Sequence, residues 1–491
     1  MALPLVSGCG VQNKPGAQAP APGAADEASK VVQVALRVNY LGTEYHPDAI
    51  AYIEDHANVK LDIIQMHMDG MQDKLNLMLA GGDRPEIVQY YDDAYEKRLA
   101  DSGMVLPLKE VMETKAPNLK KEWGEKVWAA MTHEDGEIYA IPTTGDTFAD
   151  FTQLYRKDWL DKIGMSIPKT LDEYYDVAVA VSQLGSNVTG QEKVYAFGGF
   201  EGFRAERYFD HIFGAYGAPV NFWLNIDGEL INGSVRSGAK EALKFVNRLY
   251  EAGAIDPEFV TDDEMRPINK MVAGMYGAPN DYMVLIQEGS HWWDIFYENC
   301  PEADIVYEPG NLTVNFPDKP TGQRANNPRG WLKTSVLKEA KNVDAAIRLI
   351  DWLATTEGNM FYMYGIPDVD YTLKPNGVVV PLTLGDDATE RSLRAFPIAS
   401  KWLILDSTPE YRKMRAEVDV NCIFPAEAGL FVSELDKYNN DLADYCREQF
   451  VKMAVGDIPI ETGFDAFVTG WNERGGKALT EALNAAAAKK K

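Results

Sequence analysis

Aromatic rings and planar polar side chains follow several of the predicted strands of this 491-residue chain. Flat rings match the apolar faces of sugar rings, while carboxylate, amide and guanidinium groups pair with hydroxyls. In an open α/β sheet, such groups project from the loops at the carboxyl ends of strands. On these grounds we select as candidate ligand-binding residues Asn39, Tyr40, Tyr90, Tyr91, Asp146, Arg204, Asn280, Asp281, Tyr282, Trp292 and Trp331.

Structural roles stay open for several of these candidates. Asp146 fits the cap of the following segment as well as a ligand contact, and Arg204 fits a surface charge. Trp292 and Trp293 point to opposite sides of an extended segment, so at most one of them is expected to face a ligand. The aromatic candidates that fit structural packing as well as ligand contact are Tyr40, Tyr90 and Trp331.

Signals for catalysis and for metal binding are poor. The chain has no G-x-S-x-G motif, no P-loop and no G-x-G-x-x-G, and its six histidines are dispersed. No C-x-x-C pair is present, and a disulfide between Cys422 and Cys446 stays open. We therefore expect no cofactor, no metal site and no enzyme activity. Paired carboxylates of a glycoside hydrolase are the open alternative, because 74 acidic residues guarantee chance pairs.

The charge balance restricts the partners. Lys and Arg number 48 against 74 Asp and Glu, which gives a formal net charge of −26. Such a surface repels a phosphate backbone, so we expect no nucleic-acid partner. No apolar run approaches the ~18 residues of a membrane-spanning helix. Hydrophobic content of 46% and charged content of 25% are typical of a globular protein.

The first thirty residues resemble the start of a bacterial lipoprotein. Small residues precede Cys9, and the stretch 15–25 is rich in Pro, Ala and Gly and has no hydrophobic periodicity. The resemblance implies that Cys9 carries the lipid and that residues 1–30 form a truncated signal and a flexible stalk. Membrane contact is then expected only through this anchor. The alternative is a chance cysteine near a flexible terminus.

Further along the chain, short strands alternate with amphipathic helices. We predict strands at 31–38, 59–65 and 85–89, and helices at 46–57 and 71–80, an order that indicates an open α/β sheet. A second block begins at the predicted capping box of Thr170 and Glu173. Helices are also predicted at 237–252 and 340–356 and after residue 433.

Ordered segments across this region resemble the extracellular solute-binding proteins of ABC importers, family 1. The segments are LAGGDRPEI (79–87), GMVLPL (103–108), GEIYAIP (136–142), LYRKDWL (154–160), PKTLDE (168–173), LYEAGAIDPEF (249–259) and AAIRLIDWL (345–353). Any one of them is a weak signal, but their order along nearly the whole chain is specific. The resemblance implies two α/β lobes joined by crossing strands, with a ligand cleft at the hinge.

The resemblance also implies domain boundaries and a function. Lobe 1 is expected from 31–150, lobe 2 from 151–330, and a return to lobe 1 with hinge and shared C-terminal helices from 331–491. The expected role is that of a monomeric receptor on the outer face of a bacterial membrane, or in the periplasm, that delivers an oligosaccharide to an ABC permease. The acidic, aromatic-rich chain favours a neutral glycan. A glycan-acting hydrolase and a non-transporting sensor of the same fold are the alternatives.

One feature of the resembling family is missing from the sequence. Relatives often carry a calcium loop of alternating carboxylates after the capping-box helix. Here residues 183–193 read QLGSNVTGQEK, and a lysine stands where a carboxylate is expected. Without carboxylates, the cost of desolvating calcium is not offset. We therefore predict that this loop binds no metal.

Overall fold

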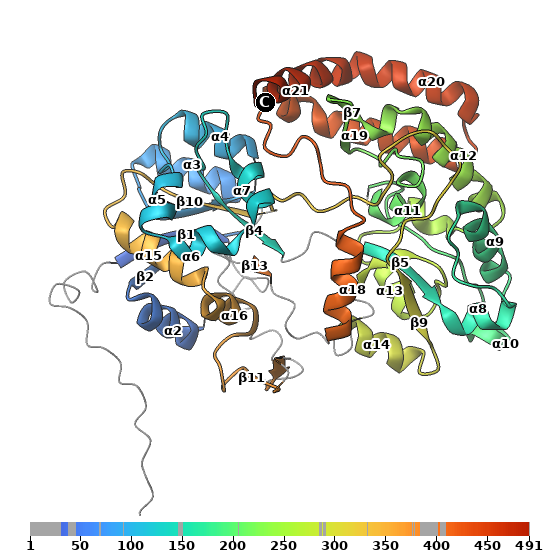
Figure 1. Ribbon diagram of the computed structural model, residues 1–491, viewed down its shortest axis with the longest axis horizontal. Helices are drawn as coiled ribbons and strands as arrows, with labels where there is room; N and C mark the ends of the chain where they lie inside the picture. Colours follow the sequence, from blue (N-terminus) through green and yellow to red (C-terminus); the bar gives the residue numbers. More distant parts are fainter. Residues whose placement is uncertain are drawn as a thin grey trace, which may run out of the picture.

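The computed structural model describes residues 31–37, 46–67, 70–91, 93–145, 151–204, 206–283, 287, 291–330, 332–375, 377, 379–382, 401–402 and 409–490. These residues form two α/β lobes that lie side by side (Figure 1), so the predicted two-lobed fold is confirmed. The core of lobe 1 is drawn from residues 32–141 and 332–361. The core of lobe 2 is drawn from residues 151–312 and 442–483.

Lobe 1 is built on a six-stranded sheet with the strand order β13-β4-β10-β3-β1-β2. β1 pairs in parallel with β2 and β3, whereas β10 runs antiparallel to β3 and β4. All residues of β3 are buried, as expected for a central strand covered on both faces. The strands are β1 (Val31–Arg37), β2 (Lys60–Met66), β3 (Ile87–Tyr90), β4 (Ile141–Gly145), β10 (Leu332–Val336) and β13 (Lys401–Trp402).

The helices of lobe 1 begin and end where local sequence signals place them. His46 caps the first helix, which is entered at Pro47, and Gly82 ends the next helix in the left-handed conformation at φ 92°. The predicted strands and helices of this block are confirmed with small shifts at their ends. The helices are α2 (Pro47–Ala57), α3 (Met71–Gly81), α4 (Asp93–Asp101), α5 (Lys109–Thr114), α6 (Pro117–Glu122), α7 (Glu125–Met131), α15 (Val343–Leu353) and α16 (Thr356–Tyr364), with the hairpin β11 (Tyr371–Leu373) and β12 (Val379–Pro381) beyond them.

Lobe 2 has a smaller sheet of three antiparallel strands, β8-β5-β9, surrounded by helices and the hairpin β6-β7. The predicted capping box is confirmed: Thr170 Oγ1 accepts from the backbone N–H of Glu173, whose carboxylate accepts from that of Thr170. The strands are β5 (Phe151–Arg156), β6 (Trp223–Ile226), β7 (Glu229–Asn232), β8 (Asn280–Tyr282) and β9 (Ile305–Glu308). The helices are α8 (Lys157–Ile163), α9 (Leu171–Ser182), α10 (Ser186–Thr189), α11 (Asp210–Phe213), α12 (Ser237–Glu251), α13 (Arg266–Val272) and α14 (His291–Asn299).

The C-terminal helices pack on lobe 2 and are not divided between the lobes as we expected. Buried residues of the helices after residue 432, including Phe450 and Trp471, belong to the core of lobe 2, and those of the helix at 409–419 form a small cluster with Met283. Cys446 is also buried in the core of lobe 2, and neither Cys446 nor Cys422 takes part in a disulfide, so the two are not paired. Among the described residues, no helix has both the length and the apolar character needed to cross a bilayer. The helices are α18 (Pro409–Asp419), α19 (Ser433–Ala454), α20 (Ile460–Trp471) and α21 (Lys477–Lys490).

The chain that returns from lobe 2 to lobe 1 is anchored near each end by a buried arginine. Arg324 donates from Nε to the carboxylate of Asp210 in lobe 2, at 2.9 Å and 3.1 Å. Arg329 donates from Nη2 to Glu96 of lobe 1 at 2.5 Å. Residues 325–328 span the distance between these anchors. They form the described part of this crossing between the lobes.

Gly330 packs the end of this crossing chain against β4, and we expect Gly330→Ala to destabilise the protein by more than about 2 kcal/mol. Its φ is +65°, and an added Cβ would collide with the carbonyl oxygen of Thr143. Gly164→Ala is the matched control, because Gly164 has a φ of +70° with no atom within 4 Å of an added Cβ. Urea unfolding of both variants separates the effect of the collision from that of backbone strain, which both share. Equal losses of unfolding free energy in the two variants would contradict the close approach of Gly330 to Thr143.

Candidate functional site

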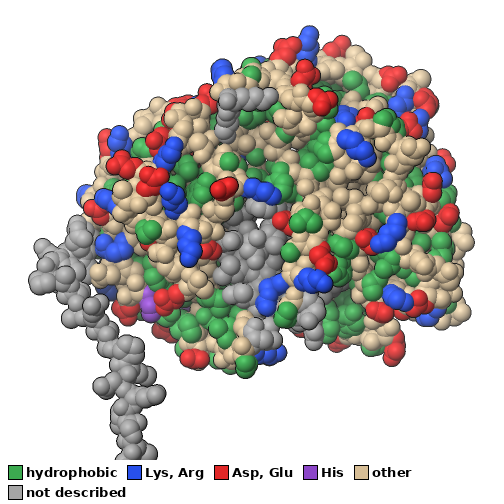
Figure 2. All heavy atoms as spheres, viewed as in Figure 1, with side chains coloured by type: hydrophobic (Ala, Val, Ile, Leu, Met, Phe, Trp, Pro, Cys, Tyr) green, Lys and Arg blue, Asp and Glu red, His purple; other side chains and the backbone are tan. Residues whose placement is uncertain are grey.

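The edge of lobe 1 that faces lobe 2 is formed by the ends of its central strands. Figure 2 shows that the surface is hollowed between the two lobes. The chain leaves lobe 1 after β4 and re-enters it at β10, so the end of β4 and the start of β10 mark this edge. β3 runs antiparallel to β10, and its carboxyl end therefore lies at the same edge. Side chains just after β3 are candidates for ligand contact.

Asp93, the first residue of α4, presents a carboxylate at this edge. It accepts a hydrogen bond from Arg329 Nε at 3.0 Å and lies 2.5 Å from Lys333 Nζ. Burial raises the pKa of Asp93, but the charges of Arg329 and Lys333 outweigh this effect and hold the pKa below its usual value. The side chain keeps 42% of its surface exposed. Asp93 is thus an ionised, immobilised acceptor that can receive a hydrogen bond from a hydroxyl.

A buried ionic group lies behind Asp93. Arg329 is 1% exposed, and its guanidinium also donates to the backbone carbonyl of Ala130 at 2.8 Å. The carboxylate of Glu96 pairs with Arg329 through one oxygen and with His133 Nε2 through the other, the latter at 2.7 Å. Because every charge in this group has a partner, the cost of its burial is offset. The group fixes the guanidinium that orients Asp93.

Lobe 2 contributes two aromatic rings where β5 begins and β8 ends. Phe151 and Tyr282 are partners in the antiparallel register, and their ring centroids lie 4.2 Å apart. The guanidinium carbon of Arg207 is 6.0 Å from the centroid of Phe151. Phe151 is buried and Tyr282 is half-buried. Since β5 is the first strand of lobe 2 after the crossing, its start and the register partner Tyr282 lie at the end of this sheet nearest the crossing.

Five of the residues selected from sequence lie outside the described residues, so their placement stays a prediction. They are the ligand candidates Asn39, Tyr40, Asp146 and Trp331 and the lipidation candidate Cys9.

The two tyrosines at the end of β3 differ in position. Tyr90 is fully buried in the core of lobe 1, and its hydroxyl lies 2.5 Å from Ser335 Oγ. This is the structural role that the sequence left open, and it removes Tyr90 from the candidate site. Tyr91 is half-buried at the interlobe edge, where its backbone carbonyl accepts from Lys333 Nζ at 3.2 Å.

Asn280 and Asp281 are fully buried within lobe 2. Asn280 donates to the backbone carbonyl of Arg207 at 2.6 Å, and Asp281 Oδ1 accepts from the N–H of Tyr282 at 2.7 Å. Asp281 Oδ2 has no hydrogen-bond partner among the described residues. Burial raises the pKa of Asp281 to about 7. Neither side chain reaches the surface, so only Tyr282 of this segment stays a ligand candidate.

The structure gives Arg204 and Trp292 structural roles within lobe 2. Arg204 is exposed and forms an ion pair with Glu201 at 2.9 Å, which agrees with the alternative of a surface charge. Trp292 and Trp293 lie on helix α14, so the extended segment that we expected there is wrong. Trp292 packs against the small cluster that contains Phe296. No contact among the described residues places Arg204 or Trp292 at the interlobe edge.

The segment that replaces the family's calcium loop is held by its own side chains. Lys193 Nζ donates to the backbone carbonyl of Ser182 at 3.1 Å, and Gln191 Nε2 donates to that of Ala273 at 2.6 Å. The side chains of Lys193 and Gln191 thus connect this loop to the backbone of neighbouring segments. The expectation that this loop binds no metal stays a prediction.

Within the described residues, one group of carboxylates lies close enough to hold a metal ion, and a lysine already fills it. Asp256, Glu258 and Asp262 bring their oxygens within 4.8 Å of one another. Lys270 Nζ donates to all three, at 2.7, 2.8 and 2.5 Å respectively. The hydroxyl of Tyr276 also donates to Asp256 at 3.0 Å. The ammonium occupies the place that a cation would take.

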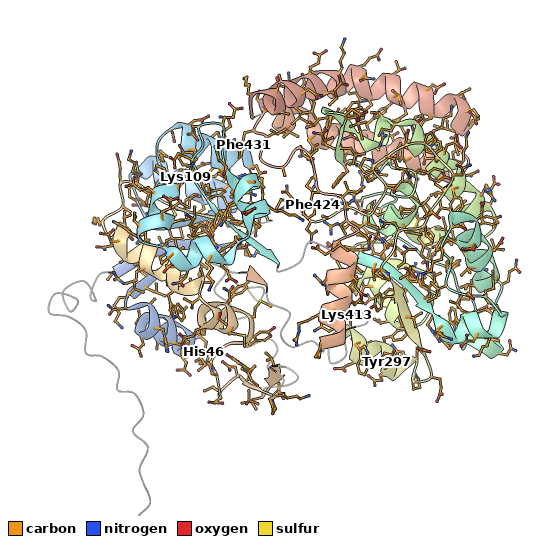
Figure 3. The ribbon with its side chains drawn as sticks, in the orientation of Figure 1. His46, Lys109, Tyr297, Lys413, Phe424 and Phe431 are labelled. Carbon is orange, nitrogen blue, oxygen red and sulfur yellow. The ribbon has the colours of Figure 1, made fainter. Side chains whose placement is uncertain are left out.

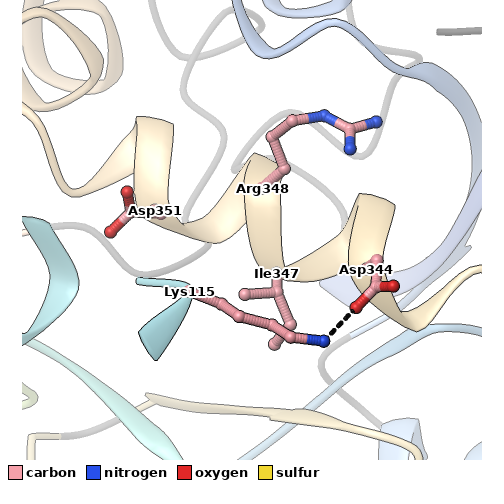
Figure 4. Close-up of a pocket in the computed structure, with 5 residues that line it drawn as sticks. All are labelled: Lys115, Asp344, Ile347, Arg348 and Asp351. Atoms are coloured by element: carbon pink, nitrogen blue, oxygen red, sulfur yellow. Dashed lines mark hydrogen bonds and ion pairs between the residues drawn. The ribbon is translucent and has the colours of Figure 1, made fainter. Parts of the chain in front are cut away.

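A pocket on lobe 1 offers no better ligand site. Figure 4 shows it beside α15. Its carboxylate Asp351 accepts from the backbone N–H groups of Asn118 and Leu119 and so caps α6, and Lys115 pairs with Asp344 at 2.6 Å. These polar groups already serve the fold. The lining residues are Lys115, Asp344, Ile347, Arg348 and Asp351.

The sequence selection missed Asp93 and Arg329 although each lies close to a selected residue. Asp93 follows Tyr91 by two positions, and Arg329 precedes Trp331 by two. The strand-end rule that selected the aromatic residues applies equally to Asp93. No local signal marks Arg329, because its partners lie more than 190 positions away.

Comparison with known proteins gives a consistent result. The family described as bacterial extracellular solute-binding protein matches residues 42–360. Lipoprotein LipO of Bacillus subtilis (strain 168) is 23% identical over 463 residues, covering 88% of this chain and 87% of LipO. The fructooligosaccharide ABC transporter substrate-binding protein FusA of Streptococcus pneumoniae serotype 4 is 30% identical over 227 residues, covering 43% of this chain and 42% of FusA.

A solved structure of an extracellular solute-binding protein from Bifidobacterium longum subsp. infantis has the same fold. It superimposes with a TM-score of 0.73 at 16% identity, covering 94% of this chain and 98% of that chain.

The burial of Asp281 predicts a pH dependence of stability. Its pKa in the folded protein, about 7, lies above the ordinary value of 3.8, so the stability that its protonated form contributes is lost as the pH rises towards and through 7. As the pH rises from 5 to 8, we expect the free energy of unfolding of Asp281→Asn to increase by roughly 1–3 kcal/mol relative to that of wild type. Urea unfolding at both pH values measures this difference. A difference independent of pH would show that the carboxyl group is ionised throughout.

The lysine-filled cluster and the loop at 183–193 predict indifference to calcium. Dialysis against a chelator, followed by addition of calcium, is expected to leave the thermal midpoint unchanged, because the ammonium groups of Lys193 and Lys270 are covalently part of the chain. Differential scanning fluorimetry checks this outcome. A rise of several degrees on addition of calcium would contradict it.

Proposed function

Because the chain belongs to the family of bacterial extracellular solute-binding proteins, we propose that it captures an oligosaccharide between its two lobes and delivers it to an ABC importer. Proteins of this family bind solutes and are not enzymes. The observation that supports the proposal is the position of Asp93 beside the end of the crossing chain in lobe 1 and of Tyr282 at the end of the lobe 2 sheet nearest the crossing.

Capture requires that the ligand favour one arrangement of the lobes. A ligand shifts such an equilibrium only by the difference between its affinities for the two arrangements. A sugar that contacts both Asp93 of lobe 1 and Tyr282 of lobe 2 binds more tightly to the arrangement in which both residues reach it. When the lobes are separated, only one of the two contacts can form. Residues 325–328 between the arginine anchors are the described connection in which we expect the backbone to adjust.

The chemistry at the two edges suits carbohydrate. Hydroxyl groups donate to carboxylates in short, charge-assisted hydrogen bonds, which Asp93 can accept because Arg329 and Lys333 keep it ionised. An aromatic ring such as that of Tyr282, which packs on the buried Phe151, covers the apolar C–H face of a sugar. The net charge of −26 disfavours an anionic ligand, which supports a neutral oligosaccharide.

The location follows from the same family. Extracellular solute-binding proteins act outside the cytoplasmic membrane, and one relative is named as a lipoprotein. A lipid on Cys9, with residues 10–30 as a stalk, would tether the two lobes near the permease. We propose that the receptor acts as a monomer, since one chain supplies both lobes of the proposed site.

The binding site is tested by calorimetric titration with neutral oligosaccharides, including fructooligosaccharides, and with oligogalacturonides as anionic competitors. We expect micromolar binding of a neutral glycan, and a loss of tenfold or more in Asp93→Asn, because the uncharged amide is a weaker acceptor. Asp101→Asn is the matched control on the same helix, since Asp101 pairs with Lys97 at the far end of α4. Silence with every sugar, together with binding of peptides, would refute a carbohydrate ligand.

A further inference from the structure

Residues 420–432, which we call the strap, connect α18 to α19 and run between the two lobes. Figure 3 labels Phe424 and Phe431 on this segment. The strap pairs with the crossing chain: Ile423 donates to the carbonyl of Gln323 and accepts from the N–H of Ala325, both at 2.8 Å. The N–H of Ala426 donates to the backbone carbonyl of Trp223 of lobe 2 at 3.0 Å. The strap is therefore fixed to lobe 2 and to the hinge.

At its end the strap contacts both lobes with alternate side chains. Leu430 and Val432 pack against the core of lobe 2. Phe431, between them, points the other way, as successive side chains of an extended chain do. Its ring stacks on the ring of His133 in lobe 1, with centroids 4.0 Å apart, and the guanidinium carbon of Arg329 lies 4.4 Å from its centroid. Phe431 is 8% exposed, so this contact excludes water.

The two groups that hold the ring are themselves tied together. His133 and Arg329 bind opposite oxygens of the same buried carboxylate, that of Glu96. Arg329 also ends the crossing chain. The ring of Phe431 thus sits in a rigid socket of lobe 1 that is located at the hinge, although its flanking residues are part of lobe 2.

We propose that Phe431 is the pivot of lobe movement, a positioning residue that lets the lobes rotate but prevents them from sliding past each other. A contact beside the rotation axis moves least, so the ring can stay in its socket while more distant parts of the lobes separate. By fixing the axis, Phe431 fixes where Asp93 of lobe 1 meets Tyr282 of lobe 2. This inference rests on the proposed capture mechanism.

The pivot is tested in the ligand-free protein, so the result does not depend on the identity of the ligand. An unnatural amino acid carries a spin label at each of two exposed positions. These are Leu77 in lobe 1, which is 75% exposed, and Glu251 in lobe 2. Pulsed electron paramagnetic resonance then measures the distance between the two lobes. Phe431→Ala is expected to broaden the distance distribution at least twofold. Phe431→Tyr, which keeps the stacked ring, is expected to retain the wild-type distribution.

Phe316→Ala serves as the control for loss of a ring. Phe316 contacts Tyr216 within lobe 2, with centroids 5.4 Å apart, and is not part of the strap. It should leave the distance distribution unchanged. If Phe431→Ala does not fold, Phe431→Leu, which keeps an apolar side chain without the stacked ring, is measured in its place. A wild-type distribution in Phe431→Ala, or in Phe431→Leu where it takes that variant's place, would overturn the proposal.

Glycan titration then separates the two proposals. If the pivot is correct and the ligand is a glycan, Phe431→Ala lowers affinity by about tenfold while Asp93 and Tyr282 stay intact. If the ligand is not a glycan, the titration is silent for all variants, but the broadened distances in Phe431→Ala still support the pivot.

Discussion

The need to neutralise one buried guanidinium organises the region between the lobes. Arg329 is almost completely inaccessible to water, and a charge in such a place is tolerated only when partners surround it. Glu96 and Asp93 supply the opposite charge and Ala130 a carbonyl oxygen. These contacts end the crossing chain at a defined point in lobe 1, orient the carboxylate that we assign to ligand binding, and form one wall of the socket for the strap.

Much of the architecture could be predicted because its signals are local. The capping box at Thr170, the proline at position 47 and the glycine at position 82 each act on the turn next to them, and the predicted elements there are confirmed. Placement of the C-terminal helices could not be predicted in this way. Their apolar faces show that they pack, but only the assembled structure shows that they pack on lobe 2.

The candidate site was harder to predict because it depends on contacts between distant positions. A tyrosine at a strand end looks the same in sequence whether it faces a ligand or, like Tyr90, the core. Adjacent tryptophans alternate in a strand but not in a helix, so the error about Trp292 followed from the wrong backbone conformation. Asp93 was available to the strand-end rule, whereas the arginine that orients it lies 236 positions away.

Lys270 gives lobe 2 a counter-ion that cannot diffuse away. A free cation bound by three carboxylates leaves when its concentration in the surroundings falls, whereas a tethered ammonium keeps the same effective concentration under all conditions. For a protein of an extracellular solute-binding family, this makes the neutralisation of these three carboxylates independent of the divalent cations in the surrounding medium.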